Sequence, residues 1–363
     1  MKILLLGEYS NVHATLAKGL EVLGHSVTVV SNGDFWKNYP RDISIDRKPG
    51  KLGGLKLMFK ILSILPKLRG YDVVQLINPM FVELKAERIF PLYKYLRKHN
   101  KKVFLCGFGM DWYWIHTCVS YKHLRYSDFN IGNKLRTNAD AIREYNDWIG
   151  TAKERLNKYI AADCDGIITG LYEYWTCYNL EIPAKTTYIP FPIGLPTQKS
   201  TSFTAPLKLF IGINKKRNEY KGTDIMLKAA EDIARKYPDK VQLRKAESIP
   251  FFQYEEMMNG SDAILDQLYS YTPSMNSLLA MSKGIICIGG GENENYELIN
   301  ENELRPIINV EPTYHSVYTE LEKLVNMPDE EICKMKQQSI EYVERHHEYR
   351  SVALQYEEFY NKA

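Results

Sequence analysis

Short apolar runs alternate with helical patterns along the whole chain. In the first half, the runs with the length of a buried strand are 2–6, 26–31, 72–77, 102–106 and 166–169. In the second half they are 207–213, 241–246, 263–268, 284–290 and 306–310. Apolar strands that alternate with helices are typical of a parallel sheet covered by helices on both faces. The pattern therefore predicts an α/β fold made of two Rossmann-like, doubly wound domains.

The two halves meet in a segment rich in Pro, Thr and Ser at 189–206, which has the composition of a linker. A chain of 363 residues is long enough for two separate cores. After the last apolar run, helical patterns follow at about 316–326, 329–346 and 350–361. We expect domains over 1–195 and 196–345, and a C-terminal helix within 346–363 that packs back on the N-terminal domain.

The composition, with 45% hydrophobic and 25% charged residues, is that of a soluble globular protein. The apolar start is too short for a signal peptide, and no later stretch is long enough to span a membrane, so we expect a cytoplasmic protein. The cysteines are scattered without a Cys-x-x-Cys pair, which favours reduced, buried thiols. We expect no metal site, because His and Cys lack ligand spacing, and no nucleic-acid partner.

The net charge is divided unevenly along the chain. Residues 1–200 hold 28 Lys and Arg against 18 Asp and Glu, a net charge of +10, whereas residues 201–363 hold 19 against 26, a net charge of −7. Within the basic half, segment 51–70 has apolar residues at helical spacing and lysines on another face: Leu55, Met58, Phe59, Leu62 and Leu65 against Lys56, Lys60 and Lys67. This segment is either an ordinary surface helix packed on its sheet or a helix that lies on anionic lipid.

In open parallel sheets, ligands bind beyond the carboxyl ends of the strands, so the residues after each strand are candidates for a site. The first strand is followed by Gly7, Glu8 and Tyr9, without the Gly-x-Gly-x-x-Gly fingerprint of a dinucleotide cofactor. Gly7 can still let backbone amides approach a phosphate or a sugar hydroxyl. His13, at the start of the next helix, either has a capping or surface role or contacts a substrate.

A second candidate loop, 107–114, combines two glycines, a carboxylate and four aromatic residues. Gly109 and Trp112 fit a platform for a sugar ring, because aromatic faces stack on sugars. Asp111 can bind hydroxyl groups or take up a proton. In the alternative interpretation the aromatic residues belong to the core and Asp111 caps a turn.

The second half contains a cationic loop before a helix that starts at Thr223. The loop carries Lys215, Lys216, Arg217 and Lys221. Arg can grip a diphosphate with two parallel hydrogen bonds, while Lys acts as a point charge, so the loop is a candidate anion site. A solvated basic loop is the alternative.

The stretch SYTPSMNSLLAMSKG (270–284) predicts a second wall for such a site. Thr272 suits a helix N-cap and Pro273 suits the first helical position. The backbone amides of Ser274, Met275 and Asn276 would then lie at the positive end of the helix dipole, where phosphate oxygens bind well.

Taken in order, these segments resemble the GT-B nucleotide-sugar glycosyltransferases, particularly the family 4 type. The matching stretches are LAKGLEVLGHSVTVVS (16–31), AADCDGIIT (161–169), YIPFPIG (188–194), KGTDIMLKAAEDI (221–233) and LLAMSKGIICIGGGENENYELI (278–299). The resemblance covers essentially the whole chain. It implies an N-terminal acceptor-binding domain, a C-terminal donor-binding domain, and contacts of Arg217 and Lys221 with the donor diphosphate.

The chain departs from that family at its Glu-x7-Glu motif. The corresponding positions are Tyr271 and Leu279, so both carboxylates that meet the donor sugar and ribose are missing. Candidates to replace them are Asp266, Asn276 and Glu292. The resemblance also places Glu247 near the nucleobase or ribose. If the reaction inverts, Asp111 or His13 is the candidate general base.

The resemblance implies a transferase that moves a hexose from a nucleoside-diphosphate sugar to a glycan or lipid-linked oligosaccharide hydroxyl, in cell-surface polysaccharide synthesis. Neither a metal nor a cofactor is implied, because the nucleotide sugar is the substrate. We expect the enzyme in the cytoplasm, with a peripheral membrane contact through 51–70 as one possibility. A nucleotide-sugar epimerase of the same fold, or a catalytically silent binding protein, are the alternatives.

Overall fold

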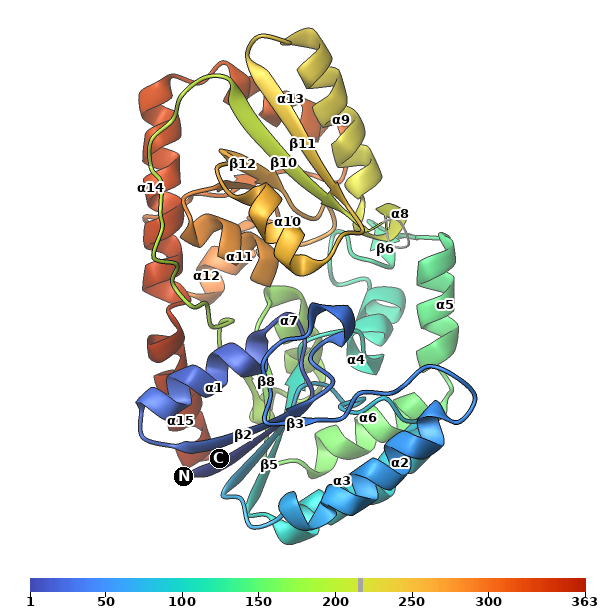
Figure 1. Cartoon of the computed structure of the whole chain (residues 1–363). Helices are drawn as coiled ribbons and strands as arrows, with labels where there is room; N and C mark the ends of the chain where they lie inside the picture. The colour runs from blue at the N-terminus through green and yellow to red at the C-terminus, as the bar shows by residue number, and fades with distance from the viewer. Residues whose placement is uncertain (215–217) are drawn as a thin grey trace. The chain divides into compact units, whose positions relative to one another are not determined.

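The computed structural model describes residues 1–214 and 218–363 (Figure 1). These residues form two compact units: unit 1 contains Met1–Tyr121, Arg143–Pro192 and Tyr349–Ala363, and unit 2 contains Lys122–Ile142 and Ile193–Glu348. We call Lys122–Ile142 the strap. The strap lies in the half of the sequence expected to form the N-terminal domain, yet it belongs to unit 2. Among the described residues, no helix combines the length and apolar character needed to cross a bilayer.

Unit 1 is built on a parallel sheet with strand order β3-β2-β1-β4-β5-β8-β9. The strands are β1 (Lys2–Leu6), β2 (Ser26–Ser31), β3 (Ile43–Ser44), β4 (Val73–Leu76), β5 (Lys102–Gly107), β8 (Gly166–Thr169) and β9 (Thr186–Tyr188). The helices are α1 (Val12–Val22), α2 (Gly53–Ile64), α3 (Ala86–His99), α4 (Trp112–His116), α6 (Ala152–Asp163), α7 (Tyr172–Glu181) and α15 (Tyr349–Lys362), with 3-10 turns at Phe35–Lys37, Leu65–Lys67 and Pro183–Lys185 and a π-helical turn at Thr117–Tyr121. Every apolar run predicted for this half contains a strand.

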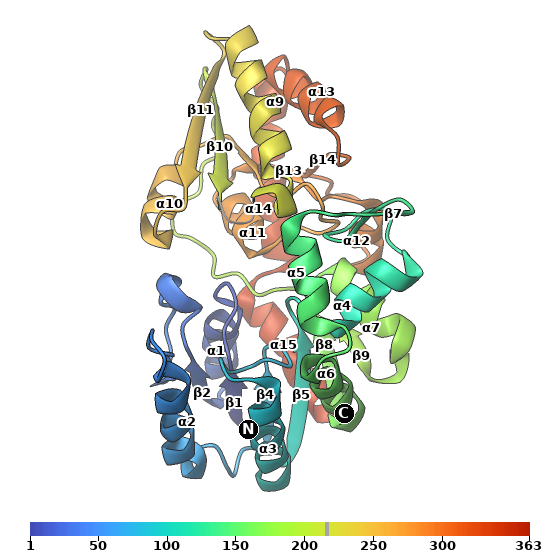
Figure 2. The same cartoon turned by 90° about the vertical axis from the view of Figure 1, so that its right-hand side faces the viewer.

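Helices cover both faces of the unit 1 sheet. Helix α15 packs against α1 on one face, and α3 packs against α6 on the other (Figures 1 and 2). Strand β1 lies between β2 and β4, which leaves Ile3 and Leu5 no exposed surface. Because both faces are covered, the strands are apolar throughout rather than alternating.

Helix α2 packs on unit 1 through apolar residues other than the stripe that the sequence analysis named. Leu57, Ile61 and Ile64 are buried. Leu55, Phe59 and Leu62 point to solvent instead, with 46%, 62% and 51% of their surface exposed.

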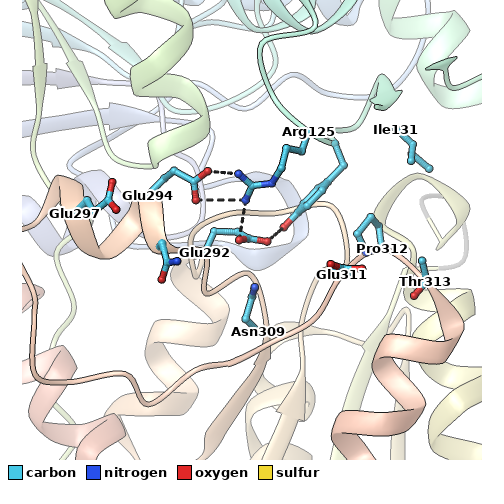
Figure 3. Close-up of a pocket in the computed structure, with 11 residues that line it drawn as sticks. Arg125, Ile131, Glu292, Glu294, Glu297, Asn309, Glu311, Pro312 and Thr313 are labelled. Atoms are coloured by element: carbon cyan, nitrogen blue, oxygen red, sulfur yellow. Dashed lines mark hydrogen bonds and ion pairs between the residues drawn. The ribbon is translucent and has the colours of Figure 1, made fainter. Parts of the chain in front are cut away.

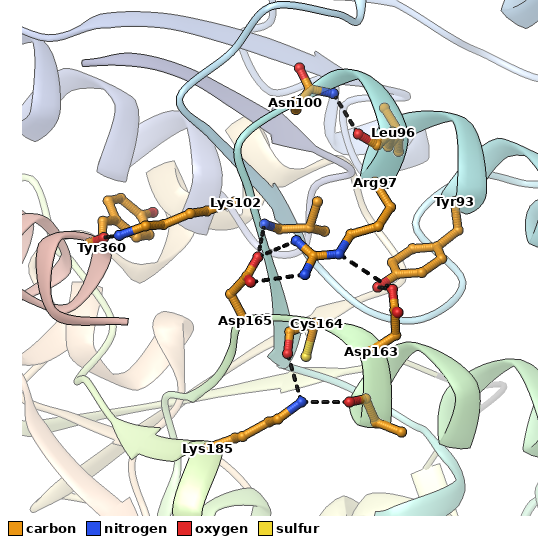
Figure 4. A network of polar contacts seen from close by, with 12 residues as sticks. Tyr93, Leu96, Arg97, Asn100, Lys102, Asp163, Cys164, Asp165, Lys185 and Tyr360 are labelled. Atoms are coloured by element: carbon orange, nitrogen blue, oxygen red, sulfur yellow. Dashed lines mark hydrogen bonds and ion pairs between the residues drawn. The ribbon is translucent and has the colours of Figure 1, made fainter.

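A network of charges joins the amino-terminal ends of β5 and β8 (Figure 4). Arg97 binds both oxygens of Asp165, at 2.5 and 3.0 Å, and lies 3.5 Å from Asp163. Asp165 also accepts a hydrogen bond from the amide of Val103 at 2.7 Å, which ties the starts of the two strands together. Tyr93 donates to Asp163 at 2.8 Å. These ends lie opposite the carboxyl ends where a ligand is expected.

Unit 2 has a second parallel sheet with strand order β11-β10-β12-β13-β14. The strands are β10 (Leu207–Ile213), β11 (Val241–Glu247), β12 (Ala263–Leu265), β13 (Ile286–Gly289) and β14 (Ile308–Asn309). The helices are α8 (Asn218–Lys221), α9 (Thr223–Lys236), α10 (Phe251–Met258), α11 (Met275–Ser282), α12 (Asn293–Leu298), α13 (Tyr314–Val325) and α14 (Asp329–His346). The strap forms a small hairpin of β6 (Asn130–Ile131) and β7 (Lys134–Leu135), and α5 (Ala139–Trp148) leads from it back into unit 1.

The core of unit 2 lies between its sheet and two pairs of helices. Helix α9 packs against α13, and α11 packs against α14 (Figure 1). Apolar residues of β10, β13, α9 and α13 form one buried cluster: Leu209, Ile211, Ile286, Ile288, Met226, Ile233, Val317 and Leu321. A buried ion pair of Lys336 in α14 with Asp262, at 2.8 Å, fixes α14 near the start of β12.

Candidate functional site

The loops at the carboxyl ends of β10, β11 and β12 bring most of the predicted donor residues of unit 2 to one edge of its sheet. Parallel pairing of β10 with both neighbours aligns these ends. Lys221 follows β10, Glu247 ends β11, and Asp266 follows β12 directly. Arg217, the other predicted diphosphate ligand, lies outside the described residues. A shared edge of this kind is where open α/β sheets bind their ligands.

Lys221 is the last residue of α8 and is held against the loop after β12. Its carbonyl accepts a hydrogen bond from the amide of Leu268 at 3.1 Å. The next residue, Gly222, has φ of 70°, and a Cβ there would lie only 2.7 Å from Leu268. Glycine is therefore required for the chain to turn from α8 into α9 at this close approach.

The side chain of Asp266 contacts the start of α11. Its Oδ2 accepts hydrogen bonds from the hydroxyls of Ser274, at 3.5 Å, and of Ser277. The amide of Asp266 donates to the carbonyl of Ile288 at 3.0 Å, so the residue is held between β12 and β13. The carboxylate is half-buried and thus remains within reach of solvent.

The start of α11 differs from the prediction. Ser274 has the extended backbone of an N-cap and Met275 is the first helical residue, whereas Thr272 and Pro273 were expected in those roles. Thr272 is buried, and its carbonyl accepts a hydrogen bond from the Ser270 hydroxyl at 2.6 Å, so Thr272 and Pro273 belong to a turn before the helix. The Met275 side chain is also buried, so any contact it makes with an anion comes from its backbone amide.

Asn276, one of the predicted replacements for the missing glutamates, is paired with a residue that the sequence analysis did not identify. Its side-chain amide donates to the hydroxyl of Tyr254 in α10 at 2.8 Å. The Tyr254 ring covers Gly212 near the end of β10, where a Cβ would lie 2.3 Å from the ring. Tyr254 thus links α10, α11 and the β10 end. Its position in an amphipathic helix gave no signal of this role.

Glu247 ends β11 with an exposed side chain. The amide of the following residue, Ser248, donates to the carbonyl of Ile213 at 2.9 Å, so this end of β11 stays beside β10. The structure therefore brings Lys221, Glu247, Asp266 and Asn276 to one edge. The role of each in binding a donor stays a prediction.

The position of the first missing glutamate, Tyr271, is used to hold the strap. The Tyr271 hydroxyl accepts a hydrogen bond from the amide of Arg125 at 2.7 Å, and its ring lies 4.7 Å from that of Tyr126. Leu279, at the second position, is half-buried in α11. Neither side chain supplies the charge of the carboxylate that the resembled family has there.

Glu292, the third candidate replacement, also binds the strap (Figure 3). It accepts hydrogen bonds from Arg125, at 2.8 Å, and from the Tyr126 hydroxyl. Arg125 also pairs with Glu294. These residues line an open pocket of about 720 Å³ within unit 2, which is further lined by Ile131, Asn293, Glu297, Asn309, Glu311, Pro312 and Thr313. Both carboxylate oxygens of Glu292 thus bind residues of the strap.

In unit 1, His13 is part of a buried chain of hydrogen bonds. Its Nδ1 lies 2.8 Å from the carbonyl of Gly7, which can only accept, so Nδ1 carries the proton. Its Nε2 then accepts from the side-chain amide of Gln75 at 3.0 Å, and Gln75 accepts from the Tyr360 hydroxyl at 2.6 Å. Burial lowers the pKa of His13 to about 4, so the ring is neutral near pH 7. This network accounts for His13 without a substrate.

Asp111 is the N-cap of α4 and has no exposed surface. Its Oδ1 accepts from the amide of Trp114 at 2.9 Å and its Oδ2 accepts from the Tyr178 hydroxyl at 2.7 Å. Burial raises the pKa of Asp111 to about 6, against these hydrogen bonds, which lower it. The capping interpretation is thus what the structure displays, and a role as general base stays a prediction.

The remaining predicted residues of unit 1 are packed in the same way. Gly7 has φ of 85°, and a Cβ there would meet Ile77 at 2.2 Å. Tyr9 packs against Gly109, whose own Cβ would lie 3.1 Å from the ring. The Trp112 ring is contacted by His116, at 4.3 Å between ring centres, and by Lys158, whose Nζ lies 3.8 Å from the ring centre. Trp112 is only 6% exposed, so little of the expected sugar platform is free.

The expectation of no metal site overlooked one Asp-x-Asp sequence, Asp163-Cys164-Asp165, a spacing that can hold a metal ion. The structure uses both carboxylates in the network around Arg97 (Figure 4). Within residues 1–214 and 218–363, no group of three or more His, Cys, Asp and Glu side chains is arranged to hold a metal ion.

Proteins similar to this chain are found by comparing structures and not by comparing sequences. No family model matches the sequence, and a search of curated proteins finds no relative. A sucrose-phosphate synthase from Thermosynechococcus elongatus has a similar structure, with a TM-score of 0.66, 14% identity, and coverage of 100% of this chain and 98% of that chain. HepE from Anabaena, in complex with UDP-glucose, has a TM-score of 0.58 at 13% identity, with 100% of both chains covered.

A third similar structure is that of a Listeria monocytogenes protein assigned as a UDP-N-acetylglucosamine 2-epimerase. Its TM-score is 0.55 at 12% identity, with 98% of this chain and 94% of that chain covered. Identities this low establish the fold and leave the reaction open. The chain has the GT-B fold, as the family resemblance implied, with the two Rossmann-like domains that the repeated strand pattern predicted.

Proposed function

We propose that the protein is a glycosyltransferase that moves a hexose from a nucleoside-diphosphate sugar to a hydroxyl of a glycan or lipid-linked oligosaccharide, in the synthesis of a cell-surface polysaccharide. The observation that carries this proposal is the group of Lys221, Glu247, Asp266 and Asn276 at the carboxyl edge of the unit 2 sheet. The fold shared with HepE, which was solved with UDP-glucose, supports it.

In the proposed donor site, positively charged groups bind the diphosphate, and the remaining polar side chains bind the sugar and the ribose. Lys221, together with the amides at the start of α11, stabilises the diphosphate, on which negative charge grows as the bond to the sugar breaks. Asp266 and Asn276 face the sugar hydroxyls as acceptor and donor of hydrogen bonds, in place of the missing glutamates. Glu247 is placed to bind hydroxyls of the ribose. The bond from the sugar to the diphosphate breaks as the acceptor hydroxyl forms the new glycosidic bond. The hydroxyl proton passes to the departing diphosphate if the reaction retains, or to a general base if it inverts.

We propose that transfer needs no protein-bound metal and no further cofactor. The only Asp-x-Asp spacing found in the sequence is engaged in the Arg97 network described above. Transfer that is unchanged by a chelator such as EDTA is the expected result. Loss of activity that Mg²⁺ or Mn²⁺ restores would contradict this part of the proposal.

A nucleotide-sugar epimerase remains the second candidate, because the Listeria monocytogenes protein has a similar fold. The two reactions differ in what they need. An epimerase converts the nucleotide sugar alone into its epimer, whereas a transferase releases nucleoside diphosphate only as sugar reaches an acceptor or water. A catalytically silent protein would bind the nucleotide sugar and do neither.

One of the two proposed acceptor classes is lipid-linked, and helix α2 supports a contact with a membrane that would carry such an acceptor. The exposed residues Leu55, Phe59 and Leu62 form one stripe, and the exposed Lys56 and Lys60 lie beside it. Apolar and basic side chains exposed side by side are typical of helices that lie in the interface of anionic membranes. We therefore place the enzyme at the cytoplasmic face of a membrane.

Vesicle flotation tests this membrane contact. We expect the protein to float with vesicles that contain anionic phosphatidylglycerol and to stay in solution with neutral vesicles. Replacing Phe59 and Leu62 by Ser should abolish flotation. The control Val22→Ser, at an apolar position outside α2 that is 60% exposed, should leave flotation intact. A wild-type protein that stays in solution with both kinds of vesicle would overturn the contact.

Thermal-shift screening of nucleoside diphosphates and nucleotide sugars tests the proposed donor. A ligand at about 100 times its Kd stabilises the folded state by roughly 2.7 kcal/mol, which gives a clear shift in Tm. The hit is then incubated with and without lipid-linked oligosaccharide, and products are separated by mass and chromatography. Sugar transfer supports the proposal, an epimer formed without acceptor supports the alternative, and no shift with any nucleotide contradicts both.

A further inference from the structure

The strap makes a second contact with the proposed donor site, through Arg136. The guanidinium donates to the carbonyl of Tyr220 at 3.0 Å and to that of Glu219 at 2.7 Å. Its central carbon lies 3.7 Å from the centre of the Tyr269 ring. Arg136 therefore joins α8 to the loop between β12 and α11, although it lies 83 and 84 residues from its carbonyl partners in the chain.

These contacts bear on Lys221, the cationic side chain proposed to bind the donor diphosphate. The last carbonyls of a helix have no partner within the helix, so their position depends on outside donors. Glu219 and Tyr220 directly precede Lys221 in α8, a helix of only four residues that cannot hold itself in place. The Glu219 carbonyl also accepts a hydrogen bond from the amide of Gly222, at 3.3 Å. By binding both carbonyls, Arg136 adds a hold on the backbone from which Lys221 projects.

Another strap residue supports the same loop. The hydroxyl of Tyr220, whose side chain is buried, donates to Asp128 at 2.8 Å. The strap is itself anchored at Tyr271 and Glu292, as described above. Unit 2 alone thus contains a connection from the ends of β12 and β13, through the strap, to Lys221.

We propose that Arg136 is a positioning residue for the donor diphosphate: the strap holds α8 in the conformation in which Lys221 meets the phosphates. This inference rests on the proposed donor site and adds a residue to it that lies in the other half of the sequence. Lysine cannot replace Arg136, because it lacks the planar fork that serves two carbonyls and stacks on a ring.

The experiment compares Arg136→Lys and Arg136→Ala with wild type and with Lys134→Ala, a control at an exposed position of the same hairpin. Calorimetry measures the affinities for UDP and for uridine, which lacks the phosphates. We expect the Kd for UDP to rise about tenfold in both Arg136 variants and to stay unchanged in Lys134→Ala, with no change for uridine in any of them. A thermal melt of each variant shows that the fold is retained.

Each other outcome decides against the inference. An unchanged Kd for UDP in the Arg136 variants, with wild type binding UDP, would overturn the positioning role and leave the donor site standing. Equal losses for UDP and uridine would show a general structural role instead. If wild type binds neither UDP nor any other nucleoside diphosphate, the proposed function fails and the inference fails with it.

Discussion

The two units present the same edge of the same kind of sheet, but they use the polar residues there differently. In unit 1, Glu8, His13 and Asp111 follow strands and are 2%, 0% and 0% exposed. Each is bound by groups of its own unit. In unit 2, Asp266 and Asn276 are half-buried and Glu247 is exposed.

The difference shows that a polar residue at a strand end has two possible uses. Burying a polar group without a partner costs free energy, so a fully buried carboxylate or imidazole is engaged within the fold. A residue that binds a ligand must keep some surface within reach of it. By this criterion unit 2 holds the better candidate site, although sequence motifs pointed to both units.

The largest expected effect is the pH dependence of the free energy of unfolding that arises from Glu8. It tests whether the polar residues at the unit 1 strand ends are buried within the fold. Burial raises the pKa of Glu8 to about 8 from 4.5, although amides of Ala14 and His13 donate hydrogen bonds that lower it. The folded state thus keeps a proton that the unfolded state releases. The associated stability is fully present below pH 4.5 and is lost as the pH rises through about 8, on the order of 5 kcal/mol in total.

Urea unfolding at several pH values between 4 and 9 measures this effect, with Glu8→Gln as the comparison. The variant has no carboxyl to titrate, so its stability should decline less over this range. Parallel curves for wild type and Glu8→Gln would show that Glu8 is already ionised in the folded state.

Replacing Lys221 should give the next largest effect, and it tests the unit 2 side. Lys221→Met removes the charge and keeps a long side chain, so affinity for UDP should fall roughly 30-fold, the value of a charge-assisted hydrogen bond. Lys334→Ala, at an exposed position in α14, is the control and should bind UDP normally. Titration calorimetry measures both, and normal binding by Lys221→Met would remove Lys221 from the site.

Asp111→Asn should give the smallest effect, on stability first. Asn has only one acceptor oxygen, so it cannot serve both the Trp114 amide and the Tyr178 hydroxyl, and we expect a loss of about 1–2 kcal/mol. Tyr178→Phe, which removes one of the two hydrogen bonds, is the matched comparison. If Asp111→Asn abolishes sugar transfer while Tyr178→Phe leaves it intact and both are equally stable, the catalytic role returns to Asp111.

Much of the fold could be predicted from local patterns. Each of the apolar runs named at the outset contains a strand, because burial of both sheet faces makes strand residues continuously apolar. The strap could not be assigned in this way. The strap is held by contacts such as that of Arg125 with Glu292, which lies 167 residues away in the chain. No local pattern identifies so distant a partner.

The candidate site was predicted in part. Loops after strands were found by position, but burial decided which loops are accessible, and burial depends on packing. The start of α11 was placed at Thr272 and Pro273 because both residues suit a helix start, yet the chain makes one more turn before Ser274. Tyr254 was missed since an aromatic residue in a helix is most often part of the core.

Hydrogen exchange with and without UDP tests the central claim most directly, because it reports on both strand edges in one experiment. We predict protection by UDP at 219–223, 246–248 and 266–277 of unit 2, and unchanged exchange at 7–14 and 107–114 of unit 1. Protection confined to the unit 1 segments, or none in either unit at saturating UDP, would contradict the assignment of the donor site to unit 2.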